Sequence, residues 1–244
     1  MKIYDFQGHC DGDIAHVSAH FQADYGCTVS TLSYRFTGLP LCPTGIPDAA
    51  AISLFPLCLK RGEELDVRDT LTTLIARKLD LLQGRIADRP PFRGPIAIKA
   101  TGFDPRKIER VRDGTLAHCC FDGASGIALD DDPAITHLLL VRGFDRILDD
   151  DVLWIHAKRR HEAAARHFGR TLITCETNLP QIAGSAPQDS YWQDCLQGAA
   201  AAAITRLLGC MIGRVAIAGG SANYERTLDP ATAAARYVTS SRLH

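Results

Sequence analysis

The stretch "ITHLLLV" (residues 135–141) is a continuous apolar run of strand length, and it decides the fold class. A run without polar alternation is typical of a strand that is buried on both faces of a parallel sheet. Similar runs occur nearby, "LAHCCF" (116–121), "TLITCET" (171–177) and "RVAIAG" (214–219). Helical patterns follow the second and third runs in chain order. The sequence therefore predicts an α/β fold with a doubly wound parallel sheet and right-handed crossovers.

Each of the two intervening helices is expected to direct an apolar face at the sheet. For the first helix, Asp149 or Asp150 is the expected N-cap and Gly169 the expected stop. Its expected apolar face consists of Leu153, Ala157, Ala164 and Phe168. The expected face of the second helix consists of Trp192, Cys195, Leu196, Ala199, Ala203 and Leu207, with Gly209 as its stop.

The first part of the chain has a different pattern, which indicates a smaller α+β region. A strand is expected at 29–36, and helices are expected at 48–60 and 69–82. Asp66 or Asp69 is the expected N-cap of the second helix, because each carboxylate can accept hydrogen bonds from free backbone N–H groups. We therefore predict an α+β region at residues 1–110 and an α/β domain at residues 111–244.

Composition and charge exclude several classes of partner. The chain of 244 residues has 27 Lys and Arg against 28 Asp and Glu, so no long-range positive field favours nucleic acid or an anionic membrane. No apolar run approaches the roughly 20 residues that span a bilayer. The nine cysteines never have C-x-x-C spacing, which argues against a disulfide framework and a zinc knuckle. We expect a cytoplasmic protein whose partner is a small molecule or another protein.

The loops after the four predicted strands should meet at one edge of the sheet, where ligands of such folds bind. These loops are "DGASG" (122–126), "RGFD" (142–145), "TNLPQ" (177–181) and "GGSAN" (219–223). Glycine permits close backbone approach to a ligand, and a strand-to-helix turn presents N–H groups to an anion. The first loop is thus a candidate phosphate loop, with a plain turn as the alternative.

Residues of about 112–240 resemble the PP-loop ATP pyrophosphatases of the adenine nucleotide alpha hydrolase-like superfamily. The segments "ITHLLLVRGFD" (135–145) and "ETNLPQ" (176–181) carry the resemblance, and "LKRGEELDV" (59–67) resembles the N-terminal region of one branch. The resemblance implies ATP and Mg²⁺ as cofactors. The residues it implies are Asp122, Gly123, Ser125 and Gly126 at the phosphates, Val141, Arg142 and Phe144 beside adenine and ribose, and Gly219, Gly220 and Ser221 on the far side.

The phosphate loop departs from the family pattern. The family's Ser, Gly, Asp and Ser are replaced by Asp122, Ala124, Gly126 and Ile127, with Gly123 retained. Asp122 sets a negative charge beside the expected phosphate, which disfavours ATP. The acidic run at 130–132 disfavours an anion too, although its carboxylates could bind Mg²⁺. With an end at "TSSRLH" (239–244), the chain resembles a degenerate and C-terminally shortened member.

Three functions follow as hypotheses. The first is ATP-dependent adenylation of a small substrate for attack by nitrogen or sulfur, as in AMP-forming ligases and transferases. The second is a non-catalytic relative that binds a small ligand or a partner protein at the same edge. The third is unrelated chemistry carried by Cys, His or a metal ion.

Several other clusters have both a structural and a functional interpretation. The segment "GHCDGDIAHVSAH" (8–20) gathers possible metal ligands, with His16 and His20 expected on one helix face, although a structural origin is favoured. Cys119, Cys120 and Cys175 are expected to be buried strand thiols rather than nucleophiles. The basic run "AKRRHE" (157–162) is expected on the exposed face of a helix, with a carrier-protein or RNA contact as the alternative.

Overall fold

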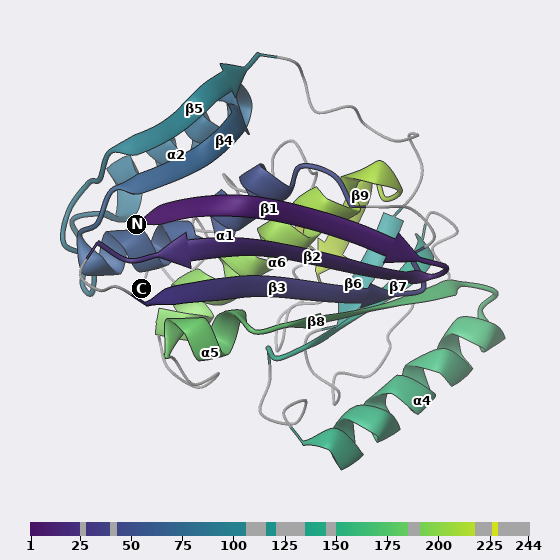
Figure 1. Ribbon diagram of the computed structural model, residues 1–244. Helices are drawn as coiled ribbons and strands as arrows, with labels where there is room; N and C mark the ends of the chain where they lie inside the picture. Colours follow the sequence, from purple (N-terminus) through teal and green to yellow (C-terminus); the bar gives the residue numbers. More distant parts are fainter. Residues whose placement is uncertain are drawn as a thin grey trace.

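The computed structural model describes residues 1–24, 28–39, 43–105, 116–120, 135–144, 150–184, 191–217 and 226–228. The strands in these ranges form one ten-stranded sheet with the order β10-β9-β6-β7-β8-β3-β2-β1-β4-β5 (Figure 1). The strands are β1 (Lys2–Asp11), β2 (Ile14–Gln22), β3 (Val29–Thr37), β4 (Leu65–Thr72), β5 (Ile98–Asp104), β6 (Leu116–Cys120), β7 (Ile135–Arg142), β8 (Thr171–Thr177), β9 (Arg214–Ile217) and β10 (Arg226–Leu228). The helices are α1 (Ile46–Arg61), α2 (Thr73–Ile86), α4 (Asp151–His167), α5 (Leu179–Ala183) and α6 (Gln197–Leu207).

The four predicted strands of the second half are parallel neighbours, as expected. β6 pairs in parallel with both β9 and β7, and β7 pairs in parallel with β8. In β7, the four consecutive residues from Leu138 to Val141 are all buried, which explains the uninterrupted apolar run. Leu139 and Val141 join the main core, whereas Leu138 and Leu140 pack beneath α4. The α/β class is therefore confirmed.

The sheet as a whole is mixed rather than parallel. β1, β2 and β3 form an antiparallel meander, and β3 pairs antiparallel with β8. The predicted strand at 29–36 is confirmed as β3. Its pairing with β8 joins the two predicted regions in one sheet, because Tyr34 lies opposite Thr177 and Phe36 opposite Cys175. The boundary between residues 110 and 111 stays a prediction.

Helices cover the two faces of the sheet unequally. α1 packs against α6, β1, β2 and β4, and all twelve residues from Asp48 to Leu59 are buried. α4 packs on the opposite face against β7 and β8, and it lies apart from the other helices (Figure 1). Among the described helices, none packs on the face of β1, β2 and β3 that points away from α1.

The predicted start of the helix at 69–82 was wrong. Helix α2 begins at Thr73, and both Asp66 and Asp69, the expected caps, lie within strand β4. Thr72 holds the N-cap position, and its side chain makes no cap hydrogen bond. Strand pairing explains the error, because β4 is hydrogen-bonded to both β1 and β5, and these tertiary contacts outweigh local helix signals.

The predicted apolar face of α4 was also partly wrong. The buried residues are Trp154, Ala157, His161 and Ala165, whereas Leu153 is 43% exposed. The face is rotated because Trp154 packs against Leu140, which anchors the helix. The predicted N-cap is confirmed, since the Asp150 side chain accepts hydrogen bonds from the backbone N–H groups of Val152 and Leu153. Within the described residues, no helix combines the length and apolar character needed to cross a membrane.

Candidate functional site

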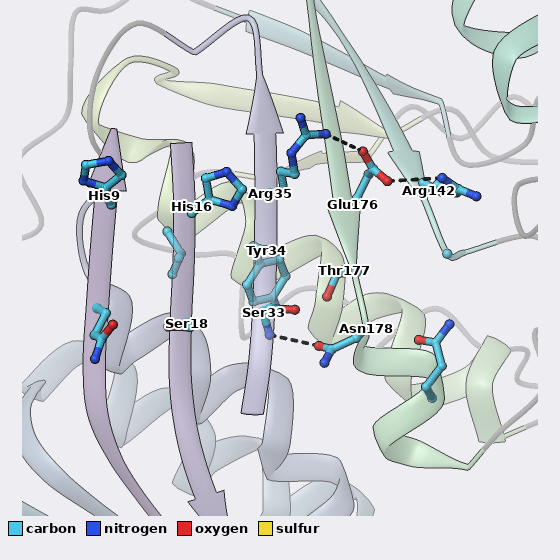
Figure 2. A pocket seen from close by; sticks show the side chains of 14 residues that line it. His9, His16, Ser18, Ser33, Tyr34, Arg35, Arg142, Glu176, Thr177 and Asn178 are labelled. Atoms are coloured by element: carbon cyan, nitrogen blue, oxygen red, sulfur yellow. Dashed lines mark hydrogen bonds and ion pairs between the residues drawn. The ribbon is translucent and has the colours of Figure 1, made fainter. Parts of the chain in front are cut away.

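An open polar cleft of about 720 Å³ lies on the uncovered face of the sheet. Side chains from β1, β2, β3, β7, β8 and α5 line it (Figure 2). β7 and β8 contribute residues at their carboxyl ends, where ligands of parallel α/β sheets bind. The cleft exists because the strands alternate, with apolar residues toward α1 and polar residues toward solvent.

Five ionisable side chains form a continuous row across this face, which we name the polar ladder. In the register of the sheet, His9 lies opposite His16, His16 opposite Arg35, Arg35 opposite Glu176, and Glu176 opposite Arg142. The row thus crosses β1, β2, β3, β8 and β7 in order. Strands are spaced about 4.8 Å apart, so the polar ladder extends over roughly 19 Å.

Glu176 orients both guanidinium groups of the polar ladder. Arg35 Nη1 donates to Glu176 Oε1 at 3.0 Å, and Arg142 Nη1 donates to Glu176 Oε2 at 3.2 Å (Figure 2). Arg142 also donates to Asp151, the first residue of α4. Burial alone would lower the pKa of Arg142, but Asp151 and Glu176 outweigh it and raise that pKa above its usual value. Arg142 is therefore fixed, whereas Arg35 is 46% exposed at the floor of the cleft.

A second polar row runs beside the ladder, two residues further along the strands. Gln7 lies opposite Ser18, and Ser18 lies opposite Ser33. Asn178 closes this row, because its Oδ1 accepts from the Ser33 backbone N–H at 2.9 Å and its Nδ2 donates to the Thr31 carbonyl at 2.8 Å. The cleft therefore combines two guanidinium groups with hydroxyl, amide and imidazole groups.

Among the residues predicted to bind a nucleotide, the structure places Arg142 in the cleft. Val141 is fully buried, and Phe144 is 2% exposed with its ring 5.5 Å from that of Trp192. Both side chains belong to the core on the other face of the sheet, so neither lines the cleft. Their contact with adenine and ribose stays a prediction. The other predicted residues lie outside the described ranges: Asp122, Gly123, Ser125, Gly126, Gly219, Gly220 and Ser221.

The predicted helix carrying His16 and His20 was wrong. The segment 8–20 forms the β1–β2 hairpin, since Asp11 pairs with Ile14 across the turn. The hairpin pairs His9 with His16 but separates other possible metal ligands from them: Cys10 packs against the core, and His20 lies 3.3 Å from Asp5, away from the ladder. In the part of the chain that the structure describes, no three His, Cys, Asp or Glu side chains are placed to hold a metal ion.

Cys175 lies under the cleft, within the core. It is fully buried in β8, and burial followed by the charge of Glu176 raises its pKa well above the usual value. The side chain is thus a neutral thiol at pH 7, which is a poor nucleophile. Cys119 and Cys120 lie on β6, and their side chains are outside the described part of the structure.

Ser18, Ser33, Arg35, Glu176 and Asn178 were not singled out by sequence reasoning. The sequence contained a signal for Ser18, Ser33 and Arg35, because polar residues alternate with apolar ones in "VSAH" (17–20) and "STLSYRF" (30–36). That alternation indicates a half-exposed strand, but it does not indicate which strands are neighbours.

Comparisons of the chain with family models, with curated proteins and with solved structures found no match.

Proposed function

We propose that this chain is a PP-loop-like protein that uses ATP, with Mg²⁺, to activate a small substrate held in the cleft. In the proposed reaction a substrate oxygen attacks the α-phosphate of ATP and releases pyrophosphate, and attack by nitrogen or sulfur on the resulting adenylate then displaces AMP. The position of Arg142 carries the proposal: it ends β7, where the family resemblance sets the edge of the nucleotide, and its side chain lines the cleft. Substrate and nucleotide would thus meet at the carboxyl ends of the parallel strands.

The charges of the cleft support this role. Transfer of a nucleotidyl group depends mainly on positioning and on stabilising negative charge. Arg142 is held in place by Glu176 and by Asp151, so its guanidinium needs little reorganisation when charge develops nearby. Arg35 brings a second, more exposed cation to the same carboxylate. The raised pKa of Cys175 argues against this residue as the nucleophile of a cysteine-based alternative.

A second candidate function is non-catalytic binding of a small ligand or a partner protein through the same cleft. Asp122 in the expected phosphate loop favours it, because this charge opposes the phosphates of ATP. Under this alternative the cleft binds its ligand, and ATP is not cleaved.

Calorimetry with ATP and Mg²⁺ tests the proposal. We expect the parent chain to bind ATP weakly and Asp122→Ser to strengthen binding about tenfold or more, since it removes a like charge and restores a hydroxyl donor. Gly123→Val should weaken binding by blocking backbone approach. Both variants must keep the parent melting profile. If neither changes ATP affinity, the nucleotide role is refuted. Binding without release of pyrophosphate in the presence of amine or thiol acceptors would favour the non-catalytic alternative.

A further inference from the structure

We propose that the cleft binds the phosphate group of its ligand at four side chains on β2 and β3, which we name the donor square. Its corners are His16, Ser18, Ser33 and Arg35. The ligand class is a polar phosphomonoester of about the size of a nucleoside monophosphate. The inference deepens the proposed function, since it names the class of molecule that the cleft would present for activation.

The register of the sheet builds the square. His16 lies opposite Arg35 and Ser18 lies opposite Ser33, so each strand contributes two residues from the same face. Neighbouring strands are about 4.8 Å apart, and residues i and i+2 are about 7 Å apart. Figure 2 shows His16 and Arg35 on the neighbouring strands β2 and β3, with the Arg35 guanidinium directed at Glu176. Buried residues alternate with them, Val17 on β2 and Tyr34 on β3, and keep both strands in place.

The chemistry of the corners suits a tetrahedral oxyanion. The guanidinium, the imidazole and the two hydroxyls can each donate a hydrogen bond. A phosphate monoester has three terminal oxygens to receive them, whereas a carboxylate has two. The four corners include no carboxylate. The nearest one on the ladder, Glu176, has both oxygens engaged by Arg35 and Arg142.

Glu176 also orients Arg35 for phosphate binding. Its contact with Nη1 of Arg35 holds the guanidinium beside β8, while the Arg35 side chain as a whole stays 46% exposed. Pre-oriented arginine lowers the entropy cost of each hydrogen bond to a phosphate. Glu176 is therefore a positioning residue for the square.

The size and the lining of the cleft indicate which groups the ligand carries besides its phosphate. β3 and β7 are separated by β8, so a phosphate held between β2 and β3 lies roughly 12 Å from strand β7, which carries Arg142. The amide side chain of Gln181 lines the cleft and can pair with hydroxyl or amide groups, and Oε1 of Gln7 can accept a hydrogen bond there. A cleft of about 720 Å³ falls in the usual range for small-molecule sites.

Titration of the full chain with inorganic phosphate and with ribose 5-phosphate tests the inference, using calorimetry at constant ionic strength. Acetate serves as the carboxylate comparator. We expect ribose 5-phosphate to bind more tightly than acetate, and Arg35→Met to weaken it about tenfold or more. His16→Gln and the Ser18→Ala/Ser33→Ala pair should weaken it less. Arg68→Met is the matched control, because Arg68 is 54% exposed and paired with Asp66 on the distant strand β4.

Each outcome has one meaning. Equal affinity for acetate and ribose 5-phosphate, or binding that survives both Arg35→Met and the double serine variant with parent melting profiles, overturns the inference. Equal losses in Arg35→Met and Arg68→Met also overturn it, since they indicate non-specific attraction. A different result would refute the proposed function while leaving the donor square in place. If ribose 5-phosphate binding depends on Arg35 but ATP binding is absent in the parent and in Asp122→Ser, the donor square stands and the nucleotide role does not.

Discussion

Replacement of Arg206 by Met should destabilise the fold strongly, because Arg206 forms a buried ion pair that joins the two halves of the sequence. Its Nε and Nη2 each lie 2.9 Å from Oδ2 of Asp48. Asp48 is 2% exposed and Arg206 is 8% exposed. The backbone N–H and the hydroxyl of Thr72 also donate to Asp48, at 2.8 and 2.6 Å. The pair thus connects α1, the start of α2 and α6.

The magnitude follows from what the substitution leaves behind. Removal of one partner of a buried ion pair costs about 3–5 kcal/mol, because the remaining charge has lost its compensation. Since Thr72 still donates to Asp48, we expect the free energy of unfolding of Arg206→Met to fall by about 3 kcal/mol. Adding Asp48→Asn removes the stranded charge, so the double variant should recover part of that loss.

Urea unfolding followed by circular dichroism measures these changes. Lys99→Met is the control, because Lys99 and Glu64 form an exposed pair and their loss should leave the midpoint unresolved from the parent. A loss below about 1 kcal/mol for Arg206→Met, at an unchanged m-value, would refute the reasoning. Equal stability of the single and double variants would show that the charge of Asp48 is compensated by other groups.

Two further predictions concern titratable groups that are buried or partly buried. Burial raises the pKa of Cys58 to about 12, and it also raises the pKa of Cys175. Both thiols should resist iodoacetamide at pH 7.5 in the folded chain and react with it in urea. Alkylation of either thiol in the folded chain, detected by mass spectrometry, would contradict their burial. Burial lowers the pKa of His137, so its contribution to stability is present above pH about 6.5 and is lost as the pH falls through its lower folded-state value. Stability from pH 7 to pH 5 should therefore fall less in His137→Asn than in the parent, and parallel profiles would exclude this linkage.

Much of the sheet could be predicted because the signals are local. The apolar run at 135–141 indicates a strand with both faces covered, and the structure buries it between the main core and α4. Asp150 was predictable as an N-cap, since its carboxylate needs only the next three residues. The helix expected at 69–82 was misplaced by four residues because strand β4 pairs with β1 and β5. Both partner strands are distant in sequence from Asp69, so the residues around Asp69 do not reveal this pairing.

The candidate site was less predictable, because its parts are distant in the chain. Arg142 was singled out through the family resemblance, at the end of a predicted strand, and the structure sets it in the cleft. Arg35 and Glu176 are separated by 141 positions, and their ion pair depends on the antiparallel pairing of β3 with β8. The N-terminal histidines were noticed as a cluster, yet their interpretation required knowing that the segment is a hairpin.

The sequence by itself determined the α/β class, the four parallel strands of the second half and the strand at 29–36. These properties depend on hydrophobic period and on turn residues, which act over a few positions. Only the tertiary structure decided that β3 lies beside β8, that α4 stops short of covering β1–β3, and that His9, His16, Arg35, Glu176 and Arg142 fall in one row. Strand neighbours and register follow from burial summed over the whole core, and a shift of one residue would turn every one of these side chains to the opposite face.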